Sequence, residues 1–389
     1  MTRIRPVLFT CLVAVLIFAG CAGKSAEVFV PSDLNGSIRT GHLVQKADHF
    51  LVILDCSGSM AELYDGEKKF VLAREAVRNM IAGIPETEMN FEAGLRVFGL
   101  TMNPFVESTS SLVDMGPLDK AAYDKALDKV TFATGKSNLA LAIAQSSDDL
   151  DRTTGEISLI IVTDGKETDG EAARALEVVK NTYRDRLCVY TIQVGHDPNG
   201  QKLLERLSRK GQCGYSENLD NVNSPKAMAC FIARGLLKKG PDQDEDGTPD
   251  RIDLCPNTPA GASVDDTGCW QLTGLEFKTN KADIAKEYYP IMDKAICVLK
   301  KTPGINVLIG GHTDSRGPDK FNQELSQDRA QAVMDYMVKK GVAPERLSVQ
   351  GFGAAKPIAP NDSQEGRAKN RRVTLTPIAV QDAESADRQ

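Results

Sequence analysis

Apolar runs and helical patterns alternate through the first part of the chain. Four runs have the length of strands and are apolar at consecutive positions, which is typical of strands buried on both faces of a parallel sheet. They are residues 50–54, 93–100, 157–162 and 187–194. Patterns with the period of a helix lie between them, at about 67–83, 118–129, 138–150 and 170–182. This alternation predicts a doubly wound, Rossmann-like α/β domain over residues 46–238.

The end of the chain has a different order of elements. Short apolar strands are predicted at 272–277, 305–309, 347–350 and 373–376. Two helices are predicted among them, one that begins near Pro290 and one over 319–339. We therefore expect an α+β domain over residues 271–378, followed by a polar, disordered tail at 379–389.

Two stretches have no sustained apolar period. Residues 21–45 are polar and contain turn signals, so they are predicted to form a flexible tether. Residues 239–270 are rich in Asp and Pro and are too short to bury a core of their own. We expect a short irregular spacer there, stabilised by a disulfide or by a metal ion.

The N-terminus carries the pattern of an export signal. Two arginines precede the apolar run 7–18, which is too short to span a bilayer but has the length of a signal-peptide core. The run ends in Phe-Ala-Gly before Cys21, which resembles the lipobox of bacterial lipoproteins. The resemblance implies a signal peptide at 1–20, a lipid (palmitate) on Cys21 and, with Ala22 next, sorting to the outer membrane. An ordinary signal peptide with a chance cysteine is the alternative.

Composition narrows the classes of function. The 389 residues are too many for one ordinary domain, and 41% hydrophobic with 26% charged residues is a globular composition. A net charge of −6 without a run of Lys or Arg argues against a nucleic-acid partner. A single long apolar run excludes a polytopic membrane protein.

Two acidic residues directly follow apolar strands of the predicted α/β domain. Asp55 and Asp164 are therefore expected at the carboxyl edge of the sheet, where open α/β folds bind ligands. Ser57 and Ser59 follow the first acid, and Ser137 precedes a predicted helix. Carboxylate and hydroxyl oxygens from three loops are suited to a hard cation such as Mg²⁺.

These three segments, in this order, resemble the metal-ion-dependent adhesion site (MIDAS) of the von Willebrand factor type A (VWFA) family. The resemblance implies that one Mg²⁺ or Mn²⁺ is held and that its open position accepts a carboxylate from an unknown protein partner. The implied ligands are Asp55, Ser57, Ser59, Ser137 and Asp164. Ser137 stands where the family usually has Thr, so Thr134 is an alternative ligand. A metal-free domain in which Asp55 is a turn residue is the alternative to a metal site.

The spacer contains a regular series of acidic residues. Acids occupy loop positions 1, 3, 5, 9 and 12 with Gly247 at position 6, a spacing that gathers oxygens around one Ca²⁺. The acids are Asp242, Asp244, Asp246, Asp250 and Asp253. The segment is similar to a thrombospondin type 3 repeat, and Cys255 and Cys269 are expected to close its loop by a disulfide. A flexible acidic linker is the alternative.

A charged pair is predicted in the C-terminal domain. Asp314 follows the strand at 305–309, and Arg329 lies on the apolar stripe of the next helix, where a lone Arg is costly unless it is paired. The constellation resembles the OmpA-like peptidoglycan-binding domain. The resemblance implies that Asp314 binds the ammonium of diaminopimelate in the stem peptide and that Arg329 binds its carboxylate. Further residues implied in the pocket are Thr313, Asn322, Leu325 and Arg371. A structural Asp314–Arg329 salt bridge is the alternative.

Cysteine positions fit an oxidising compartment. The pairs predicted from proximity in sequence are Cys255–Cys269 and Cys213–Cys230. Cys188 in an apolar strand and Cys297 in an amphipathic helix are expected to be buried as small hydrophobic residues.

Together these patterns predict an outer-membrane lipoprotein that faces the periplasm. It would link the membrane to peptidoglycan without a covalent bond and present a metal-dependent protein-binding domain, and it would not be an enzyme. A Mg²⁺-dependent envelope hydrolase using Asp55 and Asp164 is one alternative, and a purely structural tether is another.

Overall fold

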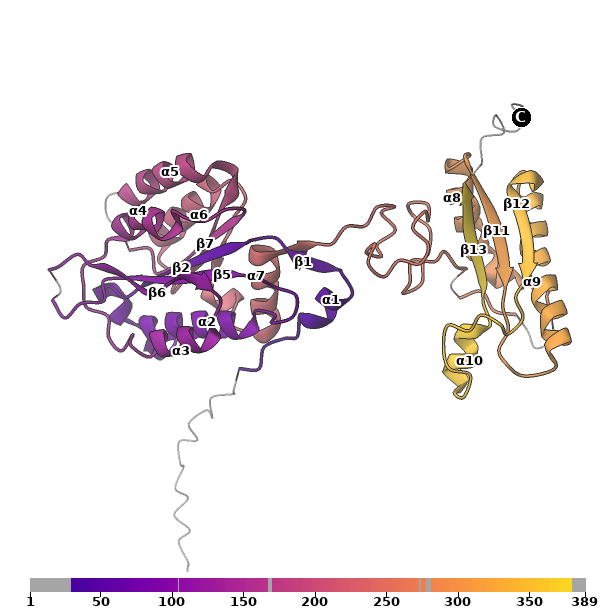
Figure 1. Cartoon of the computed structure of the whole chain (residues 1–389), viewed down its shortest axis with the longest axis horizontal. Coiled ribbons are helices and arrows are strands. Elements are labelled where there is room, and N and C mark those ends of the chain that lie inside the picture. The colour runs from indigo at the N-terminus through magenta and orange to yellow at the C-terminus, as the bar shows by residue number, and fades with distance from the viewer. Residues whose placement is uncertain (1–28, 104, 167–169, 273, 278–280, 380–389) are drawn as a thin grey trace, which may run out of the picture.

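The computed structural model describes residues 29–103, 105–166, 170–272, 274–277 and 281–379. An α/β part and a smaller C-terminal part are joined by a segment without helix or strand (Figure 1). The predicted signal peptide, the lipidation site Cys21 and the tail beyond 379 lie outside the described residues. Within the described ranges, no helix has the length and apolar character needed to cross a membrane.

A six-stranded sheet forms the centre of the α/β part, in the order β6-β5-β2-β7-β8-β9. Its strands are β2 (His49–Asp55), β5 (Glu92–Phe98), β6 (Thr109–Pro117), β7 (Ile157–Thr163), β8 (Leu187–Gln193) and β9 (Ser216–Asn218). All neighbours are parallel except β6, which runs antiparallel to β5 at one edge. Every residue of β2, β7 and β8 is buried, as expected for strands covered on both faces.

Helices cover both faces of this sheet (Figure 1). One apolar cluster packs α2 (Lys69–Gly83), α3 (Lys120–Leu127) and α7 (Pro225–Leu236) against the sheet. The other packs α4 (Leu139–Leu150), α5 (Glu171–Tyr183) and α6 (Pro198–Lys210). Asp or Asn side chains cap the N-termini of α3, α4 and α6, which fixes where these helices begin.

The segment before β2 is part of the fold. α1 (Asn35–Arg39) places Ile38 in the core with 2% of its surface exposed, and β1 (Leu43–Gln45) pairs antiparallel with β10 (Leu237–Lys239). The prediction of a flexible tether over 21–45 is therefore wrong for its described part. The cause is that Phe29, Leu34 and Leu43 bury apolar surface although their spacing has no regular period.

The C-terminal part is an α+β domain with a three-stranded sheet in the order β12-β11-β13. Its elements are α8 (Tyr289–Lys301), β11 (Ile305–Gly311), α9 (Asp319–Lys339), β12 (Leu347–Gly351), α10 (Gln364–Asn370) and β13 (Val373–Ala379). β12 is parallel and β13 antiparallel to β11. The strand predicted at 272–277 is not formed, because Leu275 turns back to hydrogen-bond the carbonyl of Leu272. Gln271 forms an isolated bridge to Thr374 of the sheet, and the Leu272 N–H donates to the carbonyl of Val373 at 3.1 Å.

Short elements complete the described chain. A small hairpin pairs β3 (Leu63–Tyr64) with β4 (Glu67–Lys68) just before α2. The 3-10 helices are η1 (Gly58–Ala61), η2 (Arg184–Arg186), η3 (Leu219–Asn221), η4 (Lys286–Tyr288) and η5 (Pro344–Arg346).

Two disulfides are present in the described residues, Cys188–Cys213 and Cys255–Cys269. The predicted Cys213–Cys230 pair is wrong, because the chain before β9 returns Cys213 to β8, where Cys188 lies. Cys188 is thus buried as a disulfide and not as a free thiol. Cys297 is exposed on α8, contrary to the prediction, and Cys230 is an exposed free thiol.

Candidate functional site

Asp55 ends β2 and is completely buried. Its Oδ1 accepts a hydrogen bond from the Ser57 N–H at 2.8 Å, and its Oδ2 accepts one from the Thr163 hydroxyl at 2.5 Å. Burial raises the pKa of Asp55 to about 7, because these neutral donors compensate only part of the lost hydration. A nearby cation would stabilise the ionised form.

A chain of oxygen atoms connects the first two predicted segments. The Ser57 and Ser59 hydroxyls lie 3.3 Å apart, and the Ser59 hydroxyl donates to Asp164 Oδ1 at 3.2 Å. Asp164 directly follows β7 and is 1% exposed. The ends of the neighbouring strands β2 and β7 thus bring both acids to the carboxyl edge of the sheet.

The third segment reaches this edge through glycine. Gly135 bridges Ser57, accepts a hydrogen bond from the Gly58 N–H at 2.8 Å and donates one to the Gly99 carbonyl at 2.9 Å. A Cβ on Gly135 would collide with Gly99, so only glycine permits this approach. Ser137 lies two residues further and is half-buried, and among the described residues its hydroxyl has no hydrogen-bond partner. The alternative ligand Thr134 donates its hydroxyl to the carbonyl of Thr101.

Sequence reasoning missed a cation at this edge. Lys69, the first residue of α2, is 6% exposed, and its Nζ lies 3.0 Å from Asp164 Oδ2 and 2.7 Å from Glu62 Oε2. Glu62 also binds Lys166 through both carboxylate oxygens. The one signal in the sequence was a lysine at the start of a helix, where a positive charge is unfavourable unless an acid pairs with it.

The donor set fits a hard divalent cation. All the ligand atoms would be oxygens, from two buried carboxylates and three serine hydroxyls. Three loops hold these side chains in place. These five predicted residues would hold Mg²⁺ or Mn²⁺, and the ion would supply an open position for an incoming carboxylate. Lys69 leaves Oδ1 of Asp164 on the side of the serines, since it binds Oδ2.

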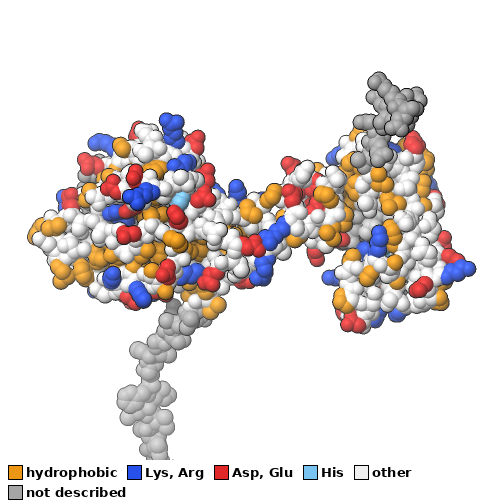
Figure 2. Space-filling model, viewed as in Figure 1, with side chains coloured by type: hydrophobic (Ala, Val, Ile, Leu, Met, Phe, Trp, Pro, Cys, Tyr) orange, Lys and Arg blue, Asp and Glu red, His pale blue; other side chains and the backbone are white. Residues whose placement is uncertain are grey.

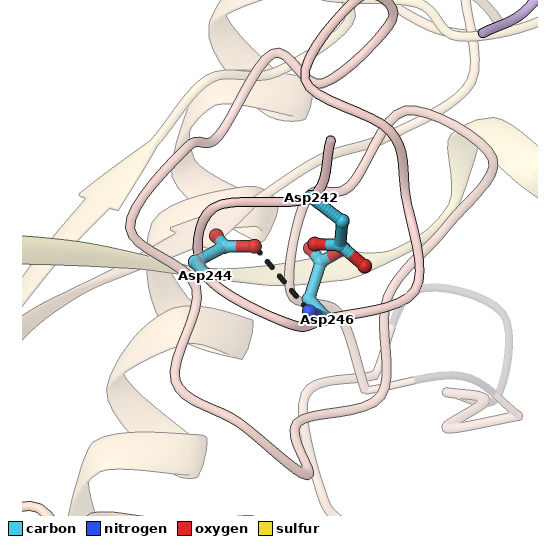
Figure 3. Close-up of side chains that lie close together, drawn as sticks. All are labelled: Asp242, Asp244 and Asp246. Atoms are coloured by element: carbon cyan, nitrogen blue, oxygen red, sulfur yellow. Dashed lines mark hydrogen bonds between the residues drawn. The ribbon is translucent and has the colours of Figure 1, made fainter. Parts of the chain in front are cut away.

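The acids of the spacer also converge. One carboxylate oxygen each of Asp242, Asp244 and Asp246 lies within 4.8 Å of the others (Figure 3). Oδ1 of Asp242 and Oδ2 of Asp246 are buried without a hydrogen-bond partner in the described part of the chain. Burial, with repulsion between the acids, raises the pKa of Asp244 and Asp246. Orphaned carboxylate oxygens in this number fit Ca²⁺.

The other two predicted calcium ligands, Asp253 and Asp250, are not among the three acids that converge in the described chain. Asp253 packs against Gly268, at a distance that leaves no room for a Cβ on Gly268, and burial raises the pKa of Asp253. The Cys255–Cys269 disulfide holds Gly268 in that place. Asp250 is exposed and accepts a hydrogen bond from the Gln243 N–H at 2.7 Å. Acidic side chains gather on the connecting segment as a whole (Figure 2).

In the C-terminal domain, Asp314 and Arg329 do not pair with each other. Asp314 is 5% exposed, and its Oδ2 accepts hydrogen bonds from Arg371 at 2.9 Å and from Arg316 at 3.2 Å. Burial opposes ionisation, but the bonds from Arg316 and Arg371 lower the pKa of Asp314 overall. The alternative of an Asp314–Arg329 salt bridge is therefore wrong, and Arg316 is a partner that sequence reasoning missed.

Arg329 is buried without an acidic partner. It is 4% exposed, and within the described residues its guanidinium makes one hydrogen bond, to the carbonyl of Lys281 at 3.2 Å. The guanidinium also lies 5.0 Å from the ring centroid of Phe277. Burial, and repulsion from Arg371, lower the pKa of Arg329, but a guanidinium stays protonated in proteins.

The remaining predicted pocket residues differ in their surroundings. Thr313 is 5% exposed with a buried hydroxyl that has no partner in the described chain. Asn322 donates its side-chain amide to the carbonyl of Arg316 at 3.1 Å, and Leu325 is half-buried on α9. The site thus holds three arginines around one acid, an excess of positive charge that suits an anionic ligand.

Both folded parts match models of known families. Residues 50–228 match the von Willebrand factor type A domain, and residues 276–371 match the OmpA family. Outer membrane porin F of Pseudomonas aeruginosa is 38% identical over 140 residues, which are 34% of this chain and 40% of that protein. Peptidoglycan-binding protein ArfA of Mycobacterium tuberculosis is 40% identical over 101 residues, 26% of this chain and 31% of that protein. The chain thus spans less than half of each relative.

Solved structures are also similar to this chain. The peptidoglycan-associated lipoprotein of Burkholderia pseudomallei is 29% identical, with a TM-score of 0.26, over 27% of this chain and 88% of that chain.

Proposed function

Since a von Willebrand factor type A domain, residues 50–228, is followed by an OmpA-family domain, residues 276–371, we propose that this protein holds peptidoglycan at one end and a protein partner at the other. The C-terminal domain would bind the stem peptide without a covalent bond. The α/β domain would bind an acidic side chain of a partner through Mg²⁺ or Mn²⁺. Both roles are binding roles, without catalysis.

One observation carries the peptidoglycan proposal: Arg329 is a buried cation that forms no ion pair with any carboxylate of the described chain. Burying an unpaired charge is costly, so an anion from outside the chain is the expected partner. The carboxylate of diaminopimelate supplies that anion, and its ammonium would bind Asp314 in exchange for the exposed Arg316. The relatives named for outer membranes and for peptidoglycan binding support this proposal.

Sedimentation with purified sacculi tests this proposal. Arg329→Ala should lower binding more than tenfold, because removing one partner of a desolvated charge pair costs about 2–5 kcal/mol. Arg346→Ala is the matched control, since Arg346 lies in the same domain but donates only to carbonyls of its own fold. Equal loss in both variants, or no loss in Arg329→Ala, would contradict a ligand role for Arg329.

The metal proposals rest on orphaned or uncompensated carboxylates. Within the described part of the chain, Asp55 is buried without a charge partner, and the spacer acids leave two buried oxygens unpaired. Mg²⁺ should raise the melting temperature of the α/β domain, as any ligand specific to the native state does, and Ser57→Ala should abolish that shift. Ca²⁺ should bind the spacer with an affinity that Asp246→Asn reduces. An unchanged shift in Ser57→Ala would place the bound metal elsewhere.

We also propose that lipid on Cys21 holds the protein at the outer membrane, facing the periplasm. The support is the lipobox-like sequence. Palmitate labelling should vanish in Cys21→Ala, and the variant should leave the membrane fraction. Labelling that persists would show that another residue carries the lipid.

A further inference from the structure

Lys69 is a buried cation inside the proposed metal site. Its ammonium contacts the buried Asp164 at 3.0 Å and the exposed Glu62 at 2.7 Å, and its side chain is 8% exposed. Among the described residues, Lys69 is the only Lys, Arg or His whose side chain contacts the carboxylate of Asp55 or Asp164; Lys166 reaches Asp164 only through its backbone N–H, at 3.1 Å. The site therefore already contains one positive charge of its own.

Two segments of the fold lie against Lys69. The Lys69 N–H donates to the carbonyl of Glu62 at 3.0 Å, so the short hairpin β3–β4 closes at the lysine. Gly195, at a φ of +97°, lies beside the lysine side chain, since a Cβ there would be in van der Waals contact with Cε at 3.4 Å. A lysine on the surface that paired with an acid by chance would not be enclosed by two segments in this way.

We propose that Lys69 is a positioning residue that acts as the resident cation of the metal site and sets its affinity. This inference rests on the proposed metal binding. Lys69 holds Oδ2 of Asp164 and so presents Oδ1 to the serine side. It also neutralises one of the two buried acids, which keeps the domain folded when no metal is bound. The same charge repels an incoming divalent cation and weakens its binding.

Removing the charge should have two opposite effects. Without metal, Asp164 would be a buried carboxylate without a cation, and the fold should be weaker. In the presence of metal, the two carboxylates of the site would no longer be offset by a positive side chain. The metal cation should therefore bind more tightly. A merely structural lysine would show the first effect alone.

The test uses the purified full-length protein and Mn²⁺, whose free ion is counted by electron paramagnetic resonance. Lys69→Gln keeps a hydrogen-bond donor but loses the charge, and Lys69→Arg keeps the charge. Lys166→Gln is the matched control, because its side chain binds Glu62 alone. Binding that survives in Asp55→Asn belongs to other sites, such as the acidic spacer, and is subtracted.

We expect Lys69→Gln to bind Mn²⁺ about tenfold more tightly and to melt at a lower temperature in EDTA. Lys69→Arg and Lys166→Gln should stay within about threefold of the wild type. Unchanged or weaker Mn²⁺ binding in Lys69→Gln, with normal binding by the wild type, would overturn the inference and leave the metal proposal standing. Absence of Asp55-dependent binding in both proteins would overturn both.

If Lys69→Gln does not fold in EDTA, its refolding is followed as Mn²⁺ is added. Refolding at a Mn²⁺ concentration below the dissociation constant of the wild type supports the inference, and failure to refold at saturating Mn²⁺ overturns it.

Discussion

The histidine two residues before Asp314, His312, is buried in its neutral form. His312 is 3% exposed, stacks on Phe352 with ring centroids 5.1 Å apart, and lies 3.2 Å from the Thr374 hydroxyl. Burial, with repulsion from Arg372 and Lys356, lowers the pKa of His312 to about 3. The unfolded chain takes up a proton on this histidine below about pH 6.5, whereas the folded domain does so only near pH 3.

We predict that the C-terminal domain loses stability as the pH falls from about 6.5 toward 3, because only the unfolded state gains a proton in this window. The loss due to His312 at pH 4.5 should be on the order of 3 kcal/mol. Trp270, the only tryptophan of the chain, is 1% exposed in this domain and reports its unfolding by fluorescence. His312→Gln should remove this part of the pH dependence, and a variant with the wild-type slope would contradict the assignment.

At the scale of residues, the sequence was most informative where the direction of a strand alone determines the position of a side chain. Asp55 and Asp164 were placed at one edge because both follow buried parallel strands, and the structure brings them together with Ser57 and Ser59. Lys69 could not be predicted there, because a hairpin fold-back and not a strand end carries it to Asp164. Arg316 was missed because nothing in the sequence shows which of several arginines reaches Asp314.

At the scale of elements, long segments with one clear period were predicted well. α9 spans the 319–339 predicted for it, because 21 residues of helical pattern leave few alternatives. The edge strand β6 was missed, since its mostly half-exposed residues lack an apolar run. The strand predicted at 272–277 was wrong for the opposite reason. Its Leu residues are buried, but a turn buries them, and burial alone does not reveal secondary structure.

The docked N-terminal segment leads to a prediction at this scale. Ile38→Ala should lower the free energy of unfolding of the α/β domain by about 2–5 kcal/mol, as expected when a fully buried aliphatic side chain is truncated. Val30→Ala is the control, because Val30 is 68% exposed and its truncation should cost almost nothing. Urea unfolding followed by circular dichroism measures both. Equal stability of the two variants would mean that the segment is a tether after all.

At the scale of the whole molecule, the spacer contacts both folded parts. Arg251 forms two hydrogen bonds with Glu88 of the α/β part, at 2.5 and 2.9 Å, and a third at 3.4 Å with the carbonyl of Ile38. At its other end, Trp270 packs into the C-terminal core and Gln271 bridges to the edge strand β13. Of the acids proposed to bind Ca²⁺, four precede Arg251 in the chain and Asp253 follows it, so that Asp250 and Asp253 flank Arg251 in sequence.

Calcium should therefore stiffen the connection between the two parts. Ligands on both sides of Arg251 would fix its backbone in the conformation that reaches Glu88. Trypsin cleaves after arginine only where the chain can be drawn out of its fold, so cleavage between Arg251 and Ile252 reports on this order. We predict slow cleavage there in Ca²⁺ and cleavage about tenfold faster or more in EDTA, measured by mass spectrometry of the fragments.

The ion pair should contribute separately from the metal. Arg251 and Glu88 are each about half exposed, and such pairs stabilise by about 0.2–1 kcal/mol. Glu88→Ala should thus raise the rate of cleavage at Arg251 in Ca²⁺ by about 1.4- to fivefold. Glu86→Ala is the matched control, because Glu86 pairs with Lys120 and does not contact the spacer.

Equal rates in Ca²⁺ and EDTA would show that calcium does not order the spacer. A dependence on calcium without any effect of Glu88→Ala would show that the spacer is ordered but not attached at Arg251. The two folded parts would then pivot about the segment that precedes the acids.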